Sequence, residues 1–246
     1  MGELLAVLSG KGGTGKTSVC AGIATSLAAA GKRVLCIDCD VGLGNLDLSL
    51  GMADSGAISF VDVCTGSYPL HQAAAHPVYE ALRFLAAPVN CPWESIDEAA
   101  FGDMLLQARS GFDYVLLDAP AGVEQGFRLA AVYADRCVLV TDSSPAAIRD
   151  AARSGQLLEQ MGKNQIRLIV NRVVKKQVST MSMTIDDVMD TTGLPLLGIV
   201  PEDPNVTLAA AFGQPLLRYR RGSRACAAFR RIANRIQGFP DPIAIR

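Results

Sequence analysis

Seven short runs of apolar residues recur along the chain, and most are separated by stretches in which apolar residues return every three or four positions. Short, nearly continuous apolar runs are typical of strands covered on both faces, as in a parallel sheet between helical layers. The predicted strands are Leu4–Leu8, Val34–Ile37, Leu82–Ala86, Tyr114–Leu117, Cys137–Val140, Leu168–Val170 and Leu196–Val200. The predicted helices are Lys16–Ala30, Ser95–Arg109, Val123–Tyr133, Ala146–Met161, Ile185–Thr192 and Arg224–Gln237. This alternation predicts a single α/β domain over residues 1–246, with a mostly parallel, twisted sheet and helices on both faces.

The composition narrows the class of protein. Half of the 246 residues are hydrophobic and 19% are charged, which excludes intrinsic disorder. No apolar run approaches the roughly 18 residues of a membrane span, and no basic segment precedes the apolar start, so neither an insertion nor an export signal is expected. Seven cysteines are an odd number in a chain too long to need disulfides. They favour reduced, mostly buried thiols in a cytoplasm.

A glycine-rich loop follows the first predicted strand and leads into a predicted helix. Its sequence, GKGGTGKT at Gly10–Thr17, fits the phosphate-binding pattern G-x-x-x-x-G-K-[ST]. In such loops backbone N–H groups surround phosphate oxygens, the lysine (Lys16) meets the β- and γ-phosphates, and the threonine (Thr17) ligates magnesium. The context disfavours a glycine-rich turn without nucleotide, and a P-loop NTPase fold is predicted. The predicted binding residues are Gly10, Lys11, Gly12, Gly13, Thr14, Gly15, Lys16, Thr17 and Ser18.

Polar residues follow several predicted strands, at the sheet edge where open parallel sheets bind ligands. The carboxylate of Asp118 is expected to hold the hydration shell of magnesium; the alternative is that Asp118 is a turn or N-cap residue. Asp38 is expected to support the metal or to be a structural carboxylate, and Asp40 is expected to orient or deprotonate the attacking water. Asn171 and Asp203 follow two later strands and are candidates for hydrogen bonds to a base or ribose, or equally for turn residues.

Four ordered segments resemble motifs of the MinD/ParA family of ATPases. The loop KGGTGKT is similar to its deviant Walker A motif, K-G-G-x-G-K-[ST], in which Lys11 is the additional lysine. Residues Asp38–Asp47 resemble its switch I segment, D-x-D-x-G-L-x-N-L-D. Residues Asp118–Glu124 resemble its Walker B and switch II segment in the form D-x-P-A-G-[IV]-E, which is typical of the cell-division branch, MinD, rather than of chromosome-partitioning ParA. Asn171-Arg172 and Val200-Pro201-Glu202-Asp203 resemble its adenine-side segments.

This resemblance implies a mechanism. In the family the first lysine, here Lys11, crosses a dimer interface to the nucleotide of the other subunit, which couples ATP binding to dimerisation. The resemblance therefore implies a homodimer that forms with ATP and uses ATP and Mg²⁺. It further implies that this dimer hydrolyses ATP slowly until a protein partner stimulates it, and that it positions the cell-division machinery. Lys11, Lys16 and Asp40 are the implied catalytic residues; Thr17, Asp38 and Asp118 are the implied metal-binding residues; and the adenine side comprises Asn171, Pro201 and Asp203.

Three other functions stay open. They are a DNA-bound partition ATPase, a regulator of flagellar number or pilus placement, and a nucleotide-gated scaffold with negligible hydrolysis. By analogy with the family, residues 146–161, with Arg149, Asp150 and Arg153, are the expected site for a regulatory partner, with an ordinary exposed helix as the alternative.

The end of the chain is strongly basic. From Arg218 onward there are eight arginines and one aspartate, a net charge of +7, whereas the whole chain carries −1. The predicted helix Arg224–Gln237 has an apolar stripe that we expect to pack against the sheet, an interfacial helix being the alternative. Its arginines suggest weak contact with anionic lipid or DNA, and hence a cytoplasmic protein with peripheral contact at the inner membrane face. Pro240 and Pro242 prevent a continuous helix, so the separate membrane-binding helix usual in MinD is not apparent.

Two cysteines and two histidines could in principle bind a metal, but neither pair is interpreted as a metal site. Cys36 and Cys39 are three apart next to a predicted strand, so their thiols should point to opposite faces of the sheet, and no metal cluster is expected. His71 and His76 have no acidic or cysteine neighbours at ligand spacing and are expected on the surface.

Overall fold

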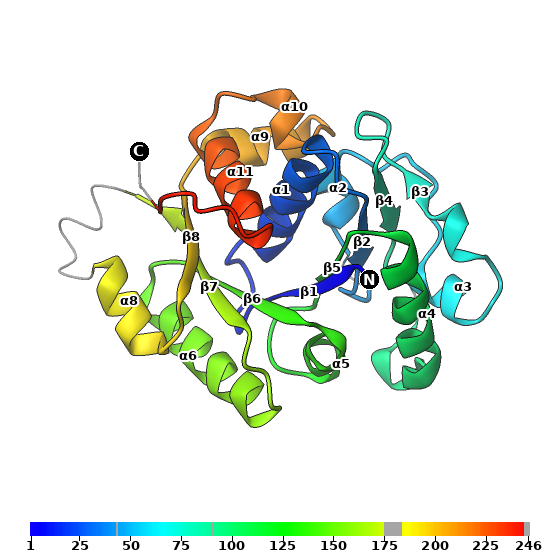
Figure 1. Cartoon of the computed structure of the whole chain (residues 1–246), viewed down its shortest axis with the longest axis horizontal. Helices are drawn as coiled ribbons and strands as arrows, with labels where there is room; N and C mark the ends of the chain where they lie inside the picture. The colour runs from blue at the N-terminus through cyan, green and yellow to red at the C-terminus, as the bar shows by residue number, and fades with distance from the viewer. Residues whose placement is uncertain (43, 90, 175–183, 244–246) are drawn as a thin grey trace.

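The computed structural model describes residues 1–42, 44–89, 91–174 and 184–243 (Figure 1). Their strands form one sheet in the order β3-β4-β2-β5-β1-β6-β7-β8. The bounds are β1 Glu3–Leu8, β2 Val34–Asp38, β3 Ala74–Ala75, β4 Leu82–Leu85, β5 Tyr114–Asp118, β6 Arg136–Thr141, β7 Ile166–Val173 and β8 Leu196–Pro201. Neighbouring strands are parallel, except that β3 runs antiparallel to β4. The predicted parallel sheet is confirmed. Only the two-residue β3 was missed, because so short a strand has no periodic pattern.

Helices cover both faces of this sheet, as Figure 1 shows. One layer consists of α1 Lys16–Ala29, α2 Leu46–Leu50, α9 Pro204–Ala211, α10 Leu216–Tyr219 and α11 Arg224–Ile236. The other consists of α3 Phe60–Cys64, α4 Glu98–Gly111, α5 Gln125–Tyr133, α6 Pro145–Gln160 and α8 Ile185–Thr192. Two short 3₁₀ helices, η1 Leu70–Gln72 and η2 Trp93–Ser95, lie in connections. A separate hydrophobic core fills each side of the sheet. The predicted α/β fold class is therefore confirmed.

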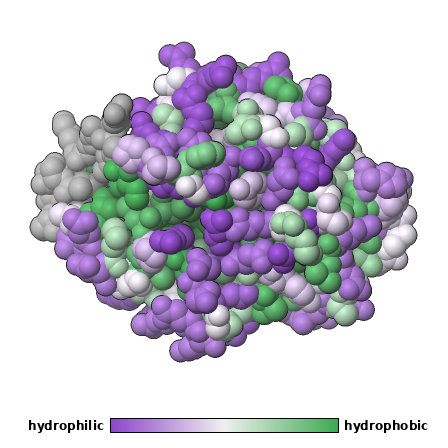
Figure 2. Space-filling view, in the orientation of Figure 1, coloured by the Kyte–Doolittle hydropathy of each residue, from purple (hydrophilic) through white to green (hydrophobic). Residues whose placement is uncertain are grey.

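The basic helix α11 packs against α1 through its apolar side. Phe229, Ile232 and Ile236 are each at most 3% exposed. The contact is close, because a Cβ added at Gly22 of α1 would lie 2.3 Å from the Phe229 ring. Ile232 also contacts the sheet, because a Cβ added at Gly198 of β8 would lie 2.4 Å from its side chain. These contacts confirm the expected packing against the sheet and contradict the alternative of a free interfacial helix. On the face seen in Figure 2 much of the surface is hydrophilic, and hydrophobic residues gather most densely on the side where β8 runs.

The structure bears on the cysteine and histidine predictions. Cys36 and Cys39 are both buried, in the cores on opposite sides of the sheet, as predicted. The surface assignment of His71 is right, whereas that of His76 is wrong, since only 2% of His76 is exposed. Its ring is held by backbone groups: Nε2 donates to the Leu50 carbonyl at 2.9 Å, and Nδ1 accepts from the Val78 N–H.

Among the described residues, no helix is both long enough and apolar enough to span a membrane.

Candidate nucleotide-binding site

The glycine-rich loop lies between the carboxyl end of β1 and the start of α1. In the sheet, Val7 of β1 is aligned with Asp118 of β5, and Asp118 is aligned with Asp38 of β2. Parallel strands end at a common edge, so these alignments bring both carboxylates beside the loop. The sheet register thus assembles residues that are far apart in the sequence.

The shape of the loop depends on its glycines. Gly13 and Gly15 have φ angles of 83° and 84°, in the left-handed region that favours glycine. A Cβ at Gly15 would also lie 2.3 Å from Asn171 Nδ2, and one at Gly10 would lie 2.4 Å from Ser154 Oγ of α6. Both positions leave no room for a side chain. At Gly12 and Gly13 an added Cβ would meet nothing within 4 Å, so that side of the loop is open.

Lys16 and Asp118 form an ion pair at the centre of the site. Their Nζ and Oδ1 atoms are 2.6 Å apart, and the side chains are only 6% and 1% exposed. Burial works against the lysine charge, but the Asp118 carboxylate outweighs it and raises the pKa of Lys16. A lysine ammonium has three N–H donors, so this pairing leaves donors available for phosphate oxygens. Lys16 is thus a buried, fully charged cation held at the loop.

Asp38 is the anchor for the segment that follows β2. Its Oδ1 accepts a hydrogen bond from the Asp40 N–H and its Oδ2 accepts one from the Leu46 N–H, each at 3.0 Å. Burial and the nearby Asp118 charge raise the pKa of Asp38 to about 7. Burial also raises the pKa of the half-buried Asp40, although Lys16 opposes this. The three carboxylates therefore share a region of unfavourable negative potential.

These residues fit a magnesium ion and a triphosphate. The Asp118 Oδ2 atom is buried and has no hydrogen-bond partner in the described residues, and the same is true of Ser9 Oγ and Thr14 Oγ1. Unpartnered buried oxygens next to clustered carboxylates are suited to a hard divalent cation, which prefers oxygen ligands. The open side of the loop at Gly12 and Gly13 gives phosphate oxygens access to the backbone. The predicted roles of these residues stay predictions.

Lys11 differs from Lys16 in both exposure and pairing. It is exposed, and it makes no hydrogen bond or ion pair with the described residues. Thr17 and Ser18 are half-buried in the first turn of α1. One loop therefore holds one buried, paired lysine and one lysine whose side chain is free to contact another molecule.

A cavity of about 210 Å³ adjoins the loop, and the predicted adenine-side residues gather around it. Gly15 and Ser18 lie on one side of it, and Asn171, Pro201 and Asp203 lie at the ends of β7 and β8. The cavity is therefore positioned to accept the base of a nucleotide whose phosphates occupy the loop. The contact of each residue with a base stays a prediction.

Two of these residues also have structural partners. Asn171 Nδ2 donates to the Thr14 carbonyl at 2.8 Å, which holds the loop against β7. Asp203 is the N-cap of α9: Oδ1 accepts from the Asn205 N–H and Oδ2 accepts from the Ala225 N–H. Although burial opposes it, these hydrogen bonds lower the pKa of Asp203. Its predicted hydrogen bond to a nucleotide must therefore coexist with the cap.

Sequence reasoning missed the structural role of Arg172. Its φ of 55° is unusual for a residue other than glycine, and its Nη1 atom donates to the Gly13 carbonyl at 2.8 Å. Thr207 also lines the cavity and was not predicted, and Glu202, which lies in the predicted adenine-side segment, lines it without having been named as a site residue. The position of Arg172 directly after Asn171 was the available signal, but an arginine does not indicate a positive φ.

A glycine loop joining a buried strand to a helix, with a buried lysine and two carboxylates on neighbouring strands, defines a P-loop nucleotide-binding protein. Residues 5–216 match the CobQ/CobB/MinD/ParA nucleotide binding domain family. The chain belongs to this family.

Within the family the chain is similar to MinD over its full length. It is 37% identical to the septum site-determining protein MinD of Bacillus subtilis over 251 residues, which cover 100% of this chain and 92% of that protein. A chain of the MinC:MinD cell division protein complex of Aquifex aeolicus has a TM-score of 0.90 and 33% identity, covering 99% of this chain and 98% of that one. MinD complexed with Mg-ADP from Pyrococcus horikoshii has a TM-score of 0.83 and 29% identity, covering 96% of each chain. The resemblance inferred from the four motifs is confirmed.

Proposed function

We propose that this protein is a MinD-like ATPase that dimerises when it binds ATP and positions the cell-division machinery. The observation that carries the proposal is the contrast within the glycine loop: Lys16 is buried and paired with Asp118, whereas Lys11 is exposed and its ammonium has no hydrogen-bond or ion-pair partner among the described residues. One lysine suffices to bind the phosphates of the same chain. The second is positioned to reach a nucleotide held by another copy. Full-length similarity to septum site-determining proteins supports the cell-division role.

In this proposal the residues of the site have separate roles. Lys16 binds the β- and γ-phosphates, and Lys11 from the second subunit neutralises the charge that develops as the γ-phosphate passes to water. Thr17, Asp38 and Asp118 would hold Mg²⁺, which supplies charge neutralisation of the phosphates. Asp40 orients the attacking water, and its burial favours a carboxylate able to accept a proton.

The proposal includes a regulatory partner protein that accelerates a slow basal hydrolysis. Support comes from the complex of MinD with MinC among the similar structures. Arg149 and Arg153 are exposed on α6 and form the surface that we assign to this partner. Co-purification with the partner in the presence of a non-hydrolysable ATP analogue, compared between wild type and Arg153→Glu, tests this surface.

The described free cysteines are compatible with the proposed location in a reducing cytoplasm.

The Lys11→Ala variant tests the central claim. Dimers that form with a non-hydrolysable ATP analogue should be lost in light scattering. Monomer affinity for the nucleotide should change by no more than about fivefold, because an exposed cation contributes at most about 1 kcal/mol. Lys32→Ala, a lysine beyond the other end of α1, is the matched control and should dimerise normally. Unchanged dimers in Lys11→Ala would contradict the proposal.

Two further measurements separate the alternatives. A nucleotide-gated scaffold would dimerise but release no phosphate even with its partner. A partition ATPase would be retained by DNA when ATP is bound.

A further inference from the structure

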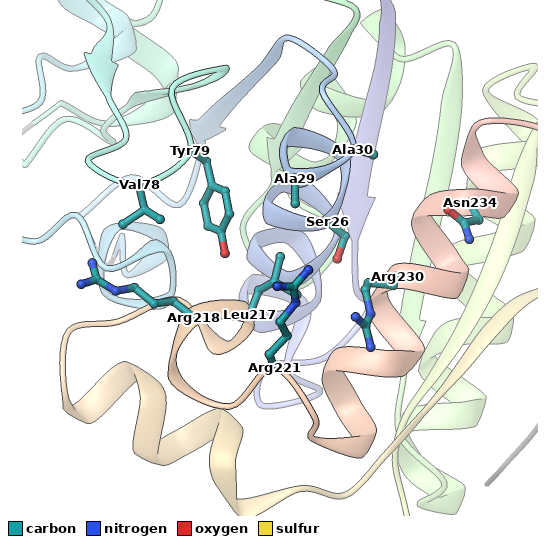
Figure 3. A pocket seen from close by; sticks show the side chains of 10 residues that line it. All are labelled: Ser26, Ala29, Ala30, Val78, Tyr79, Leu217, Arg218, Arg221, Arg230 and Asn234. Atoms are coloured by element: carbon teal, nitrogen blue, oxygen red, sulfur yellow. The ribbon is translucent and has the colours of Figure 1, made fainter.

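A second, larger cavity lies at the opposite end of α1 from the glycine loop. Its volume is about 650 Å³, within the usual range of small-molecule sites. Ser26 and Ala29 of α1, with its C-cap Ala30, form one wall, and Tyr79 and Arg230 lie on other sides (Figure 3). The 14 residues from Lys16 to Ala29 form about 20 Å of helix, so this cavity is separate from the nucleotide site.

Three arginines line this cavity, which we call the arginine pocket: Arg218, Arg221 and Arg230. All three are exposed, and none of their guanidinium groups makes a hydrogen bond or ion pair with another described residue. The lining contains no aspartate or glutamate among the described residues. The pocket therefore concentrates positive charge that the protein itself does not neutralise.

The arginine charges act on the same space. Figure 3 shows the Tyr79 hydroxyl and the Arg221 guanidinium directed into the pocket, with Arg230 approaching from α11 and Arg218 beside Val78. Burial raises the pKa of Tyr79, and the charges of Arg221 and Arg218 oppose that rise. Burial likewise raises the pKa of Cys226, which Arg230 and Arg221 oppose. In Figure 3 Arg221 lies between Arg218 and Arg230.

The wall that carries Tyr79 is held in place by the buried His76. The His76 ring accepts hydrogen bonds from the Val78 and Tyr79 N–H groups at 3.0 and 3.1 Å. Its other nitrogen donates to the Leu50 carbonyl of α2. The two rings also pack with centroids 4.9 Å apart. Because these bonds fix Tyr79, the pocket is formed before any ligand binds.

The lining combines cations with apolar surface. Ala29, Ala30, Leu217 and Val78 provide aliphatic surface beside the phenol of Tyr79. Guanidinium groups bind phosphate oxygens in paired, charge-assisted hydrogen bonds. We propose that the arginine pocket binds a phosphate group carried on a small organic moiety, as in a phosphate monoester or a phospholipid headgroup. The phosphate contacts Arg221 and Arg230, and the organic part lies on the aliphatic surface. This site does not depend on the proposed ATPase function.

The test uses the full chain saturated with Mg-ADP, so that the glycine loop is occupied, and sn-glycerol 3-phosphate as the probe. Titration followed by ¹H–¹⁵N NMR should shift the amide signals of Tyr79, Arg221 and Arg230. The double variant Arg221→Gln/Arg230→Gln should weaken binding by at least about tenfold, because it removes charge-assisted hydrogen bonds. Arg224→Gln is the matched control: Arg224 is exposed on α11 outside the pocket, and binding should be unchanged.

A second arm separates the two sources of phosphate. Vesicles of phosphatidylglycerol and phosphatidylcholine are sedimented with each variant, with and without sn-glycerol 3-phosphate. Binding of the soluble ester alone supports a small-molecule ligand. Sedimentation that fails only in the double variant and is reduced by the ester supports a headgroup.

Three outcomes would overturn the proposal. They are binding of neither probe, signal shifts confined to Gly10–Ser18, and equal losses in Arg224→Gln and the double variant. The last result, together with retention on a short DNA duplex, would indicate a diffuse basic surface for nucleic acid. Thermal unfolding of each variant verifies the fold.

Discussion

The two ends of α1 carry cations in opposite environments. At the amino end Lys16 is buried and neutralised by Asp118 at 2.6 Å. At the carboxyl end the arginine pocket holds three exposed arginines without a carboxylate among the described lining residues. A buried charge requires a partner, because the cost of removing it from water is large. An exposed charge does not. The first arrangement couples a cation to the fold, and the second leaves guanidinium groups available to a ligand.

The largest expected effect on stability is at the amino end of α1, where Lys16 is buried. Lys16→Met should lower the free energy of unfolding by about 3–5 kcal/mol, because it leaves Asp118 as an unpaired buried charge. It should also abolish nucleotide binding. Urea unfolding and nucleotide titration measure the two effects. Lys11→Met makes the same change at an exposed lysine of the same loop, and its stability should stay within about 0.5 kcal/mol of wild type. Equal losses in both variants would show that burial does not distinguish these lysines.

A smaller effect should appear as a pH dependence at Asp38. Its pKa is about 7 in the folded protein, against an ordinary value of about 3.9. Between pH 4 and 7 the folded state binds the Asp38 proton more tightly than the unfolded state does. The contribution of Asp38 to the free energy of unfolding therefore falls as the pH rises through this range, and it is constant above about pH 7. The total change is on the order of 4 kcal/mol, since each pKa unit corresponds to about 1.4 kcal/mol.

Denaturant unfolding from pH 4 to 8 checks this effect, with Asp38→Asn as the comparison. The difference between wild type and Asp38→Asn should change across this window, whereas the exposed Asp54→Asn should follow the wild-type profile. A constant difference for Asp38→Asn would contradict the prediction.

The smallest effect belongs to the arginine pocket. Arg221→Gln should change the free energy of unfolding by less than about 0.5 kcal/mol, since the side chain is exposed and unpaired. Thermal unfolding measures it. A large destabilisation would mean that Arg221 supports the fold, and the contrast between the ends of α1 would be lost.

Strands and helices were predictable to different extents. Seven strands were predicted because each is an apolar run of at least three residues, buried on both faces. Four helices of four to eight residues were missed: α2, α3, α9 and α10. Helices of four or five residues show too few turns for a periodic pattern, and packing rather than propensity stabilises them. Helix α9 is as long as the predicted α8, but its mostly apolar sequence, PNVTLAAA, has no regular apolar spacing. The capping box at Ser59 and Asp62 of α3 was a signal that could have been used.

His76 illustrates a different limit. The sequence shows no partner for it, and an isolated histidine is commonly on the surface. Its partners are a carbonyl at Leu50, 26 positions earlier, and two backbone N–H groups of its own loop. Backbone groups carry no sequence signal, so the structural role of this ring in forming the arginine pocket could not be predicted.

The sequence by itself determined the parallel sheet, the glycine loop and the carboxylates at the strand ends. These features follow from local patterns: apolar runs, glycines where the backbone needs a positive φ, and polar residues after strands. Only the tertiary structure decided which cations are neutralised. Lys16 meets Asp118 across 102 positions, and the arginine pocket joins α1, the Tyr79 loop and α11. Such contacts depend on how distant segments pack, because burial and charge pairing are properties of the assembled fold.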